Sequence, residues 1–267
     1  MEELKTMALV INEKQIGEAD KLLTMLTPEH GRLVVSGKGV QSLRSRHMAS
    51  CQLFCYSNFV FRKSKKYYYI SDSDTEECFF NIRFDIEKVA LATYMCDVAC
   101  DLALEDVGDP ELLRLMLNSL YALSTKKNLS LDHIKAAFEF RAAVQGGFMP
   151  ILDSCGVCGK EPIDDNIVFD VMNGMFRCSE CTRLVSKEGI DPSGTAEIYH
   201  KINRTVLTAL RFIATAPITK FLSFSIPAED MELLARFAES YLLSHLEHSF
   251  SSLKYFKDIR INGIDYE

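Results

Sequence analysis

The sequence Cys155-Gly156-Val157-Cys158, followed nineteen residues later by Cys178-Ser179-Glu180-Cys181, decides how the second half of this 267-residue chain folds. The pattern C-x2-C-x19-C-x2-C has the spacing of a structural zinc site, to which each pair contributes two thiolates. Four protein ligands leave no position for water or substrate, so we predict one structural Zn2+ per chain and no zinc chemistry. Each pair could instead be a redox dithiol or a disulfide, although a redox pair usually occurs once beside a βαβ pattern, and none is present here.

Composition places the chain among ordinary globular proteins. It is 48% hydrophobic and 25% charged, and it is long enough for about two domains with a substantial core. The first five residues lack the layout of a signal peptide, and no apolar run is long enough to span a membrane. We therefore expect a cytoplasmic protein whose nine cysteines are reduced or metal-bound, with the five outside the two pairs behaving as small buried hydrophobes: Cys51, Cys55, Cys78, Cys96 and Cys100.

Charge is distributed unevenly. The segment from His30 to Ser71 contains no Asp or Glu, so the remaining 225 residues carry −15 of a chain whose net charge is −7. A concentrated positive region on an acidic protein indicates an anionic partner with a defined docking face. The eight basic residues of the segment are Arg32, Lys38, Arg44, Arg46, Arg62, Lys63, Lys65 and Lys66. We predict that the last seven bind DNA phosphates; the alternative for residues 62–66 is a solvated hairpin turn.

The first eighty residues have the pattern of β-strands. Short apolar or aromatic runs alternate with turn signals at Gly17, at residues 28–31 and at residues 37–39. Five strands without intervening helices predict a small closed barrel, and the OB-fold is the common barrel of this size that binds oligonucleotides. The predicted strands are residues 4–11, 22–27, 33–38, 51–61 and 67–70.

After Asn81 the hydrophobic period becomes helical. Asp109 before Pro110 and Ser130 before Leu131 are expected helix N-caps, and further helices are expected at residues 195–215 and 228–254. The predicted fold class is α+β. An OB-fold domain at residues 1–80 precedes an all-α domain at residues 81–267, in which the zinc module occupies about residues 151–185.

The basic segment also contains seven aromatic residues, and aromatic rings beside cations are how single strands are held without sequence readout. Tyr67 and Tyr69 should point to one side of a strand and Tyr68 to the other. The aromatic residues therefore cannot all be core or all be stacking platforms, and the simpler interpretation is that most of them fill the barrel: Phe54, Tyr56, Phe59, Phe61, Tyr67, Tyr68 and Tyr69.

Two other patterns carry less weight. No P-loop is present, so nucleotide hydrolysis has no support. His245-Leu246-Glu247 matches half of a zinc deaminase signature, but it follows both cysteine pairs and is interpreted as a helix surface. The acidic run from Asp72 to Glu77 is interpreted as a solvated turn.

Several stretches resemble the RecO family of bacterial DNA repair proteins. The resemblance covers nearly the whole chain and is carried by residues 17–24, 27–31, 38–39 and 45–46, by 138–141 and 147–150, by 169–176, by 252–254, and by the four cysteines. The combination of these stretches is specific although no single one is, and Cys155, Cys158, Cys178 and Cys181 match the zinc ligands of that family.

The resemblance implies an OB-fold, a helical domain and a zinc site. It also implies binding of single- and double-stranded DNA, annealing of complementary strands and, with RecR, loading of RecA onto strands covered by single-stranded-DNA-binding protein (SSB). Arg141 is placed where it could contact the acidic tail of SSB, although an ion pair within its own helix is an equal alternative. A nucleoid-associated cytoplasmic location follows from this role.

Three hypotheses are open. The leading one is a DNA-binding mediator of repair that is not an enzyme. The second is a protein–protein adaptor with weak DNA affinity, and a zinc-dependent hydrolase acting through Glu247 is the weak third.

Overall fold

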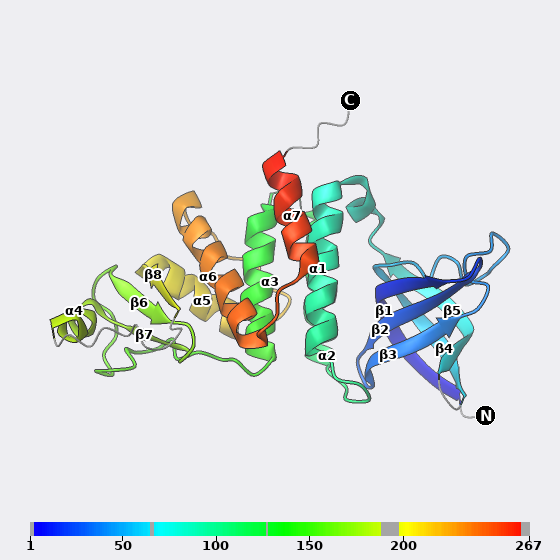
Figure 1. The fold of residues 1–267 in the computed structure, drawn as a ribbon, viewed down its shortest axis with the longest axis horizontal. Helices are drawn as coiled ribbons and strands as arrows, with labels where there is room; N and C mark the ends of the chain where they lie inside the picture. The colour runs from blue at the N-terminus through cyan, green and yellow to red at the C-terminus, as the bar shows by residue number, and fades with distance from the viewer. Residues whose placement is uncertain (1–2, 65–66, 127, 188–197, 263–267) are drawn as a thin grey trace. The chain divides into compact units, whose positions relative to one another are not determined.

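The computed structural model describes residues 3–64, 67–126, 128–187 and 198–262 (Figure 1). Contacts within the chain group it into two units. Unit 1 comprises Met1–Lys127 with Phe250–Glu267, and unit 2 comprises Asn128–Ser249. The predicted domain boundary near residue 80 stays a prediction.

Unit 1 begins with five strands that form a closed barrel in the order β1-β2-β3-β5-β4. All neighbouring strands run antiparallel except β3 and β5, which are parallel. The predicted α+β class with an N-terminal OB-type barrel is therefore confirmed. The strands are β1 (Glu3–Ile16), β2 (Asp20–Thr27), β3 (Gly31–Gly37), β4 (Cys55–Lys63) and β5 (Tyr68–Cys78).

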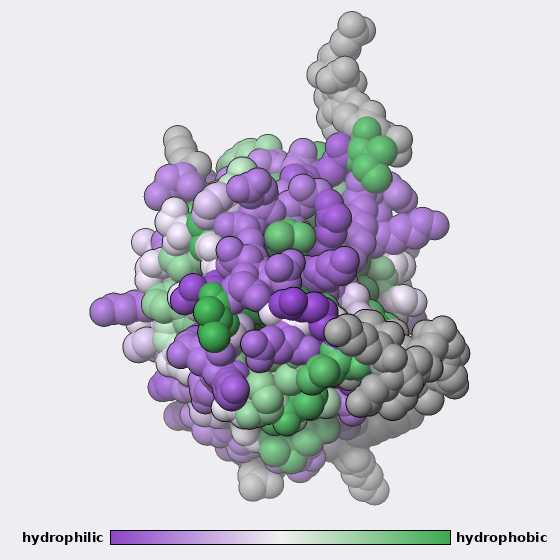
Figure 2. All heavy atoms as spheres, turned by 90° about the vertical axis from the view of Figure 1, so that its left-hand side faces the viewer, coloured by the Kyte–Doolittle hydropathy of each residue, from purple (hydrophilic) through white to green (hydrophobic). Residues whose placement is uncertain are grey.

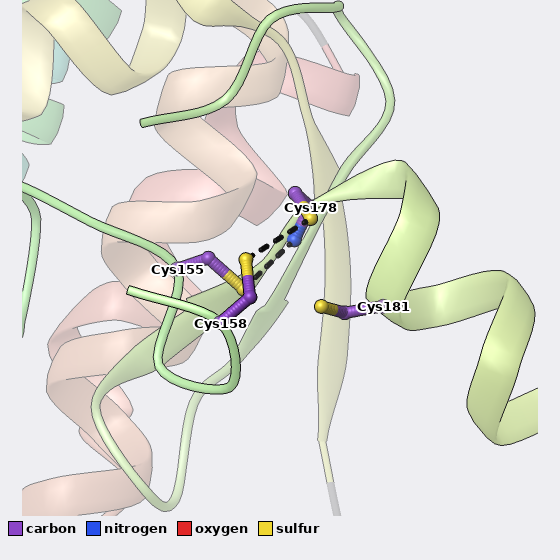
Figure 3. Close-up of side chains that lie close together, drawn as sticks. All are labelled: Cys155, Cys158, Cys178 and Cys181. Atoms are coloured by element: carbon purple, nitrogen blue, oxygen red, sulfur yellow. Dashed lines mark hydrogen bonds between the residues drawn. The ribbon is translucent and has the colours of Figure 1, made fainter. Parts of the chain in front are cut away.

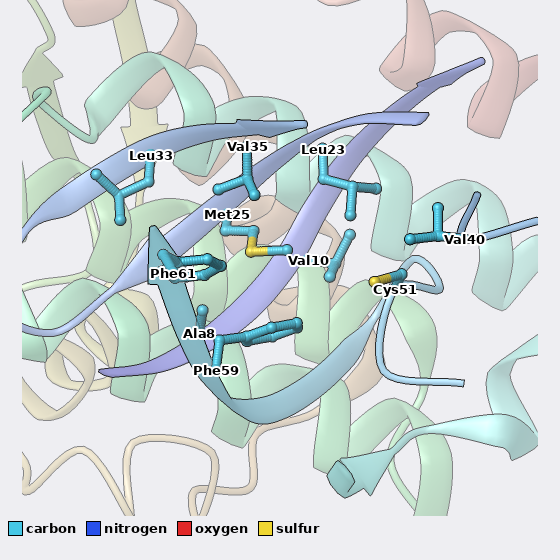
Figure 4. Close-up of a cluster of buried hydrophobic side chains, with 10 residues drawn as sticks. All are labelled: Ala8, Val10, Leu23, Met25, Leu33, Val35, Val40, Cys51, Phe59 and Phe61. Carbon is cyan, nitrogen blue, oxygen red and sulfur yellow. The ribbon is translucent and has the colours of Figure 1, made fainter. Parts of the chain in front are cut away.

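The interior of the barrel is filled by alternate residues of each strand, as the two-residue period of a strand requires (Figure 4). Phe59 and Phe61 on β4 are completely buried, and their rings stack at a centroid distance of 5.3 Å. Phe54 is also buried. Three of the seven aromatic residues are therefore buried and Tyr68 packs partly against the barrel core, so fewer of them fill the barrel than the simpler interpretation predicted.

The prediction of an acidic turn at residues 72–77 is wrong. Strand β5 continues to Cys78, and its acidic half pairs with β4 from Tyr56↔Glu77 to Val60↔Asp72. Asp and Glu have low strand propensity, but pairing with a central strand outweighs local preference, and these side chains face outward or stay exposed.

The expectation of reduced cysteines is wrong for Cys55 and Cys78, which form a disulfide. The two residues lie directly opposite each other in the β4–β5 register. Sequence spacing gave no sign of the bond, because only the strand pairing brings the two residues together. Cys51 and Cys96 are buried free thiols, as expected, and Cys100 is half-buried.

The other described elements of unit 1 are helices: η1 (Phe80–Phe84), α1 (Ile86–Leu102), α2 (Pro110–Thr125) and α7 (Ser251–Asn262). The predicted cap Asp109 accepts a hydrogen bond from the backbone N–H of Leu112. The barrel is joined to α1 through Arg32, which donates to the carbonyl of Cys100 (2.7 Å) and pairs with Glu105. Arg32 therefore binds the C-terminal end of α1. Gly31 is required beside it, because a Cβ there would lie 2.2 Å from the carbonyl oxygen of Leu104.

The described residues of unit 2 form four helices and a three-stranded sheet of order β7-β6-β8. Ser130 caps its first helix by accepting from the N–H of His133, as predicted. Between α3 and α6, the buried Lys135 bridges Glu139 and Glu239, each at 2.7 Å. The elements are α3 (Leu131–Gln145), β6 (Ile167–Asp170), β7 (Met175–Arg177), α4 (Ser179–Lys187), β8 (Tyr199–Ile202), α5 (Arg204–Thr215) and α6 (Ala228–Leu246).

Two predicted helices are wrong in their bounds. Tyr199–Ile202 is strand β8, which pairs with β6, so the helix predicted from residue 195 starts only at Arg204. The helix predicted over 228–254 is divided between α6 and α7, because Glu247 adopts a left-handed conformation (φ 50°) and ends α6. Nothing in the local periodicity marks this break.

His245 is not on a helix surface. Its ring stacks on the Phe148 ring with a centroid separation of 4.8 Å and meets the Tyr241 ring edge-on with a centroid separation of 4.4 Å. Glu247 lies beyond the end of α6. Within the described residues, no helix is both apolar and long enough to cross a bilayer.

Candidate nucleic-acid interface and metal centre

The strand register assembles the outer face of the barrel around Tyr69. On β5, Tyr68 and Ile70 pack against the barrel core, so Tyr69 between them points outward. Its neighbour on β3 is Ser36 and its neighbour on β4 is Arg62. The row continues from Ser36 to Leu22 on β2 and Lys14 on β1, and from Arg62 to Glu3 on β1.

Three predicted phosphate-binding residues converge on this part of β5. Arg62 lies directly across from Tyr69, and the Lys38 ammonium lies 5.1 Å from the centre of the Tyr69 ring. Arg46 reaches from the β3–β4 loop and donates to the backbone carbonyl of Ser71 at 3.0 Å. We call Lys38, Arg46, Arg62 and Tyr69 the β5 cluster.

The other predicted residues are placed less closely. Lys63 ends β4 and lies over the ring of Tyr68 at 5.5 Å, whereas Arg44 is exposed in the same loop as Arg46. Lys65 and Lys66 lie outside the described residues. The side chains or pairing positions of Lys38, Arg46, Arg62 and Lys63 therefore meet β5 between Tyr68 and Ser71. No such contact with β5 is seen for Arg44 among the described residues.

Two carboxylates occupy the cluster in the unbound protein. Arg62 pairs with Glu3 at 3.2 Å and Arg46 pairs with Asp72 at 3.5 Å, and all four side chains are about half exposed or more. Exposed pairs of this kind contribute only about 0–1 kcal/mol, so an incoming anion can replace them. The sequence did not reveal Glu3 as a partner of Arg62, because Glu3 lies far outside the acid-free segment. Only the β1–β4 register brings Glu3 opposite Arg62.

His47 fixes the loop that carries Arg46. Its Nδ1 lies 2.7 Å from the Ser73 hydroxyl on β5, and Arg46 Nε donates to its Nε2 at 3.1 Å. Burial, followed by the nearby Arg46 charge, lowers the pKa of His47. A neutral ring can accept from Arg46, so the loop is held in place near neutral pH.

The four cysteines form the second site (Figure 3). Cys155 and Cys158 lie in the loop before β6, Cys178 directly follows β7, and Cys181 lies in the first turn of α4. All four sulfurs lie within 4.8 Å of one another. Gly159 adopts φ +69° immediately after the first pair, and Gly156 has no room for a Cβ, which would lie 2.4 Å from the Met175 sulfur.

The thiols fit a tetrahedral metal ion. Zn–S bonds of 2.3 Å require sulfur–sulfur distances of about 3.8 Å, and Cys158 and Cys178 are separated by 3.8 Å. Burial opposes ionisation of Cys155, but backbone hydrogen bonds from Cys158, Cys178 and Val157 outweigh it and lower its pKa to about 6. Burial, with hydrogen bonds among the thiols, raises the pKa of Cys181 to about 12. A bound cation would favour ionisation of the whole set.

The surface around the four-cysteine cluster is mainly hydrophilic. Figure 2 shows the face that carries α4 and the β6–β8 sheet; the largest group of hydrophobic residues lies toward its lower part, with smaller ones scattered elsewhere. Exposed hydrophobic side chains of this region include Val157, Ile163 and Met172.

Arg141 lies on α3 and its guanidinium donates to the carbonyls of Ile213 (2.8 Å) and Ala214 (2.5 Å) at the end of α5. This contact complements the negative end of a helix dipole. The predicted contact of Arg141 with an acidic tail stays a prediction.

An OB-type barrel with basic residues on its outer face, followed by helices and a four-cysteine cluster that could hold a metal ion, defines the class of protein. The family model described as "Recombination protein O N terminal" matches residues 1–79, and "Recombination protein O C terminal" matches residues 83–254. The chain therefore belongs to the RecO family of DNA repair proteins.

Curated relatives agree with this assignment. The DNA repair protein RecO of Acetivibrio thermocellus is 32% identical over 259 residues, which cover 97% of this chain and 98% of the relative. RecO of Caldanaerobacter subterraneus is 29% identical over 249 residues, covering 93% and 95% of the two chains. RecO of Caldicellulosiruptor saccharolyticus is 28% identical over 260 residues, covering 97% and 100%.

Proposed function

We propose that this protein is a DNA-binding mediator of recombinational repair that acts without covalent chemistry. The observation that carries the proposal is the convergence of Lys38, Arg46 and Arg62 on one outward face of the barrel in a member of the RecO family. Cations on an exposed β-surface can contact phosphates of single- and double-stranded DNA.

Annealing of complementary strands requires only this electrostatic function. Two strands repel each other through their phosphates, and a protein that neutralises phosphates lowers this repulsion. Base pairing then supplies the driving force. The mechanism needs no nucleophile or hydrolytic metal, and four cysteine ligands would leave a bound Zn2+ closed to substrate.

We further propose that the four-cysteine cluster holds one structural Zn2+. The metal would fix the loop before β6 to the start of α4. Its thiolate ligands and the sulfur spacing support this role.

Partners of the mediator are proposed from the family. With RecR, the protein would help load RecA onto strands covered by SSB, and it would contact the acidic tail of SSB, for which Arg141 is the proposed contact. A location at the nucleoid and an OB-fold DNA-binding domain at residues 1–80 belong to the same proposal.

Charge reversal combined with salt dependence tests DNA binding. If about four cations contact single-stranded phosphates, log K should fall against log salt with a slope near −3. Arg44→Glu with Arg46→Glu should abolish most of the affinity and make the remaining slope shallower. Binding of fluorescent oligonucleotides measures both quantities, and Arg114→Glu on α2 is a matched control. A salt-independent affinity would contradict the proposal.

The second candidate is an adaptor whose basic face binds an acidic protein surface. The Arg46–Asp72 and Arg62–Glu3 pairs favour it, because they show that the face accepts carboxylates. Under this alternative the isolated protein binds DNA only weakly at low salt, and the double variant changes nothing measurable in DNA binding.

A further inference from the structure

Tyr69 differs from the other aromatic residues of the barrel in its orientation. Phe54, Phe59 and Phe61 are buried. Tyr68 faces the core, where the centre of its ring lies 6.2 Å from the centre of the Phe61 ring. Tyr69 is half-buried and points outward between Ser36 and Arg62. Its ring is therefore on the same surface as the cations.

The cations around Tyr69 lie on different sides of it. Lys38, just after β3, lies over the Tyr69 ring, Arg62 lies across on β4, and Arg46 reaches from the β3–β4 loop to Ser71, two residues along β5 from Tyr69. An aromatic ring flanked by cations is the arrangement that binds single strands, because a base can stack on the ring while its flanking phosphates meet the cations.

The acidic half of β5 limits where a strand can lie. From Asp72 to Glu77 the strand carries four exposed acidic residues, Asp72, Asp74, Glu76 and Glu77. A phosphate backbone is repelled from this half, so the Tyr69 end is the favoured end of β5 for a nucleic acid.

We infer that Tyr69 is the residue on which an unpaired nucleobase stacks when the β5 cluster binds single-stranded DNA, which gives the face a preference for single strands over duplex. The inference rests on the proposed DNA binding. In a duplex the bases are stacked on each other and unavailable to the ring, whereas the phosphates remain accessible to Lys38, Arg46 and Arg62.

Tryptophan fluorescence tests the stacking directly, because the chain contains no tryptophan. Tyr69→Trp introduces a single probe at the proposed platform, and oligothymidylate at saturating concentration should quench most of its emission. Tyr121→Trp, at an exposed position on α2, is the control that should stay unquenched.

A second probe tests the competing platform. Phe84 on η1 is 86% exposed, and the neighbouring Arg83 lies over the ring of Phe80 at 5.3 Å. Quenching of Phe84→Trp without quenching of Tyr69→Trp would overturn the inference and assign stacking to η1.

Affinity measurements complete the test. Tyr69→Ala should lower affinity for oligothymidylate about tenfold and affinity for a duplex of equal length by less than about twofold, and Tyr69→Phe should restore it. Equal losses on both ligands would overturn the inference while leaving DNA binding intact. Failure of the unmodified protein to bind either ligand would instead refute the proposed function itself.

Discussion

At the scale of single residues, the carboxylates of Glu3 and Asp72 pair with Arg62 and Arg46, and under the proposed function they would compete with DNA phosphates for these arginines. Both acids lie on the barrel surface within 3.5 Å of their arginine partners. The net charge of the face is therefore lower than its count of basic residues suggests. The number of lysines and arginines in the segment from His30 to Ser71 overstates its attraction for DNA.

Removing these competitors should strengthen DNA binding. We expect Glu3→Gln with Asp72→Asn to raise affinity for single-stranded DNA about two- to fivefold at low salt, since each exposed pair is worth up to about 1 kcal/mol. The gain should shrink as salt rises, because salt screens exposed charges. Fluorescence anisotropy measures the change.

A matched control is Glu111→Gln, which removes the exposed partner of Arg114 on α2 and should leave DNA affinity unchanged. An unaltered or weaker affinity of the Glu3/Asp72 variant would show that Arg46 and Arg62 do not contact phosphates.

At the scale of elements, α6 ends in a packed contact between His245, Phe148 and Tyr241. Tyr241 donates from its hydroxyl to the carbonyl of Phe148 at 3.0 Å, and His245 lies against both rings. Burial lowers the pKa of His245, although a hydrogen bond with the backbone of Val171 partly opposes this. The helix end therefore favours the neutral imidazole.

The resulting pH dependence has a definite sign. The unfolded chain takes up a proton at His245 as pH falls through about 6.5, whereas the folded chain does so only at lower pH, so the free energy of unfolding decreases between these values. Burial also lowers the pKa values of His47 and His200, which add to the same trend.

We expect His245→Gln to flatten part of this decrease. Urea denaturation at about pH 7.5 and about pH 5.5 measures it, with the exposed His248→Gln as control. If His245→Gln lost stability with pH as steeply as the unmodified protein, His245 would not titrate across this interval.

The elements that sequence patterns predicted poorly are those whose conformation depends on a distant partner. Strand β8 forms where helical periodicity suggested a helix, because its backbone pairs antiparallel with β6. The acidic half of β5 is a strand because β4 pairs with it. By contrast, Asp109 and Ser130 cap α2 and α3 as predicted, because capping depends only on residues within one turn.

At the scale of the whole molecule, the proposed metal site and the proposed DNA-binding face belong to different units. Cys155, Cys158, Cys178 and Cys181 lie in unit 2, and the β5 cluster lies in unit 1. Loss of the metal should therefore affect stability and DNA binding to different extents.

We expect Cys155→Ser or Cys178→Ser to bind little zinc and to melt at a lower temperature, with a much smaller change in DNA affinity. Protein grown with zinc should contain about one ion per chain. Metal analysis, thermal unfolding and DNA titration measure the three quantities, and Cys100→Ser is the control that should retain zinc. A zinc content near zero in the unmodified protein would overturn the structural role.

The sequence by itself indicated the α+β class, the five strands of the first eighty residues, the helix caps and the four-cysteine set, because each is marked by local patterning, turn signals or fixed motif spacing. Only the tertiary structure decided that Lys38, Arg46 and Arg62 meet at Tyr69, that Asp72 and Glu3 pair with Arg46 and Arg62, and that Cys55 is bonded to Cys78. These contacts depend on strand register, and register is set by pairing between segments that are distant in the chain.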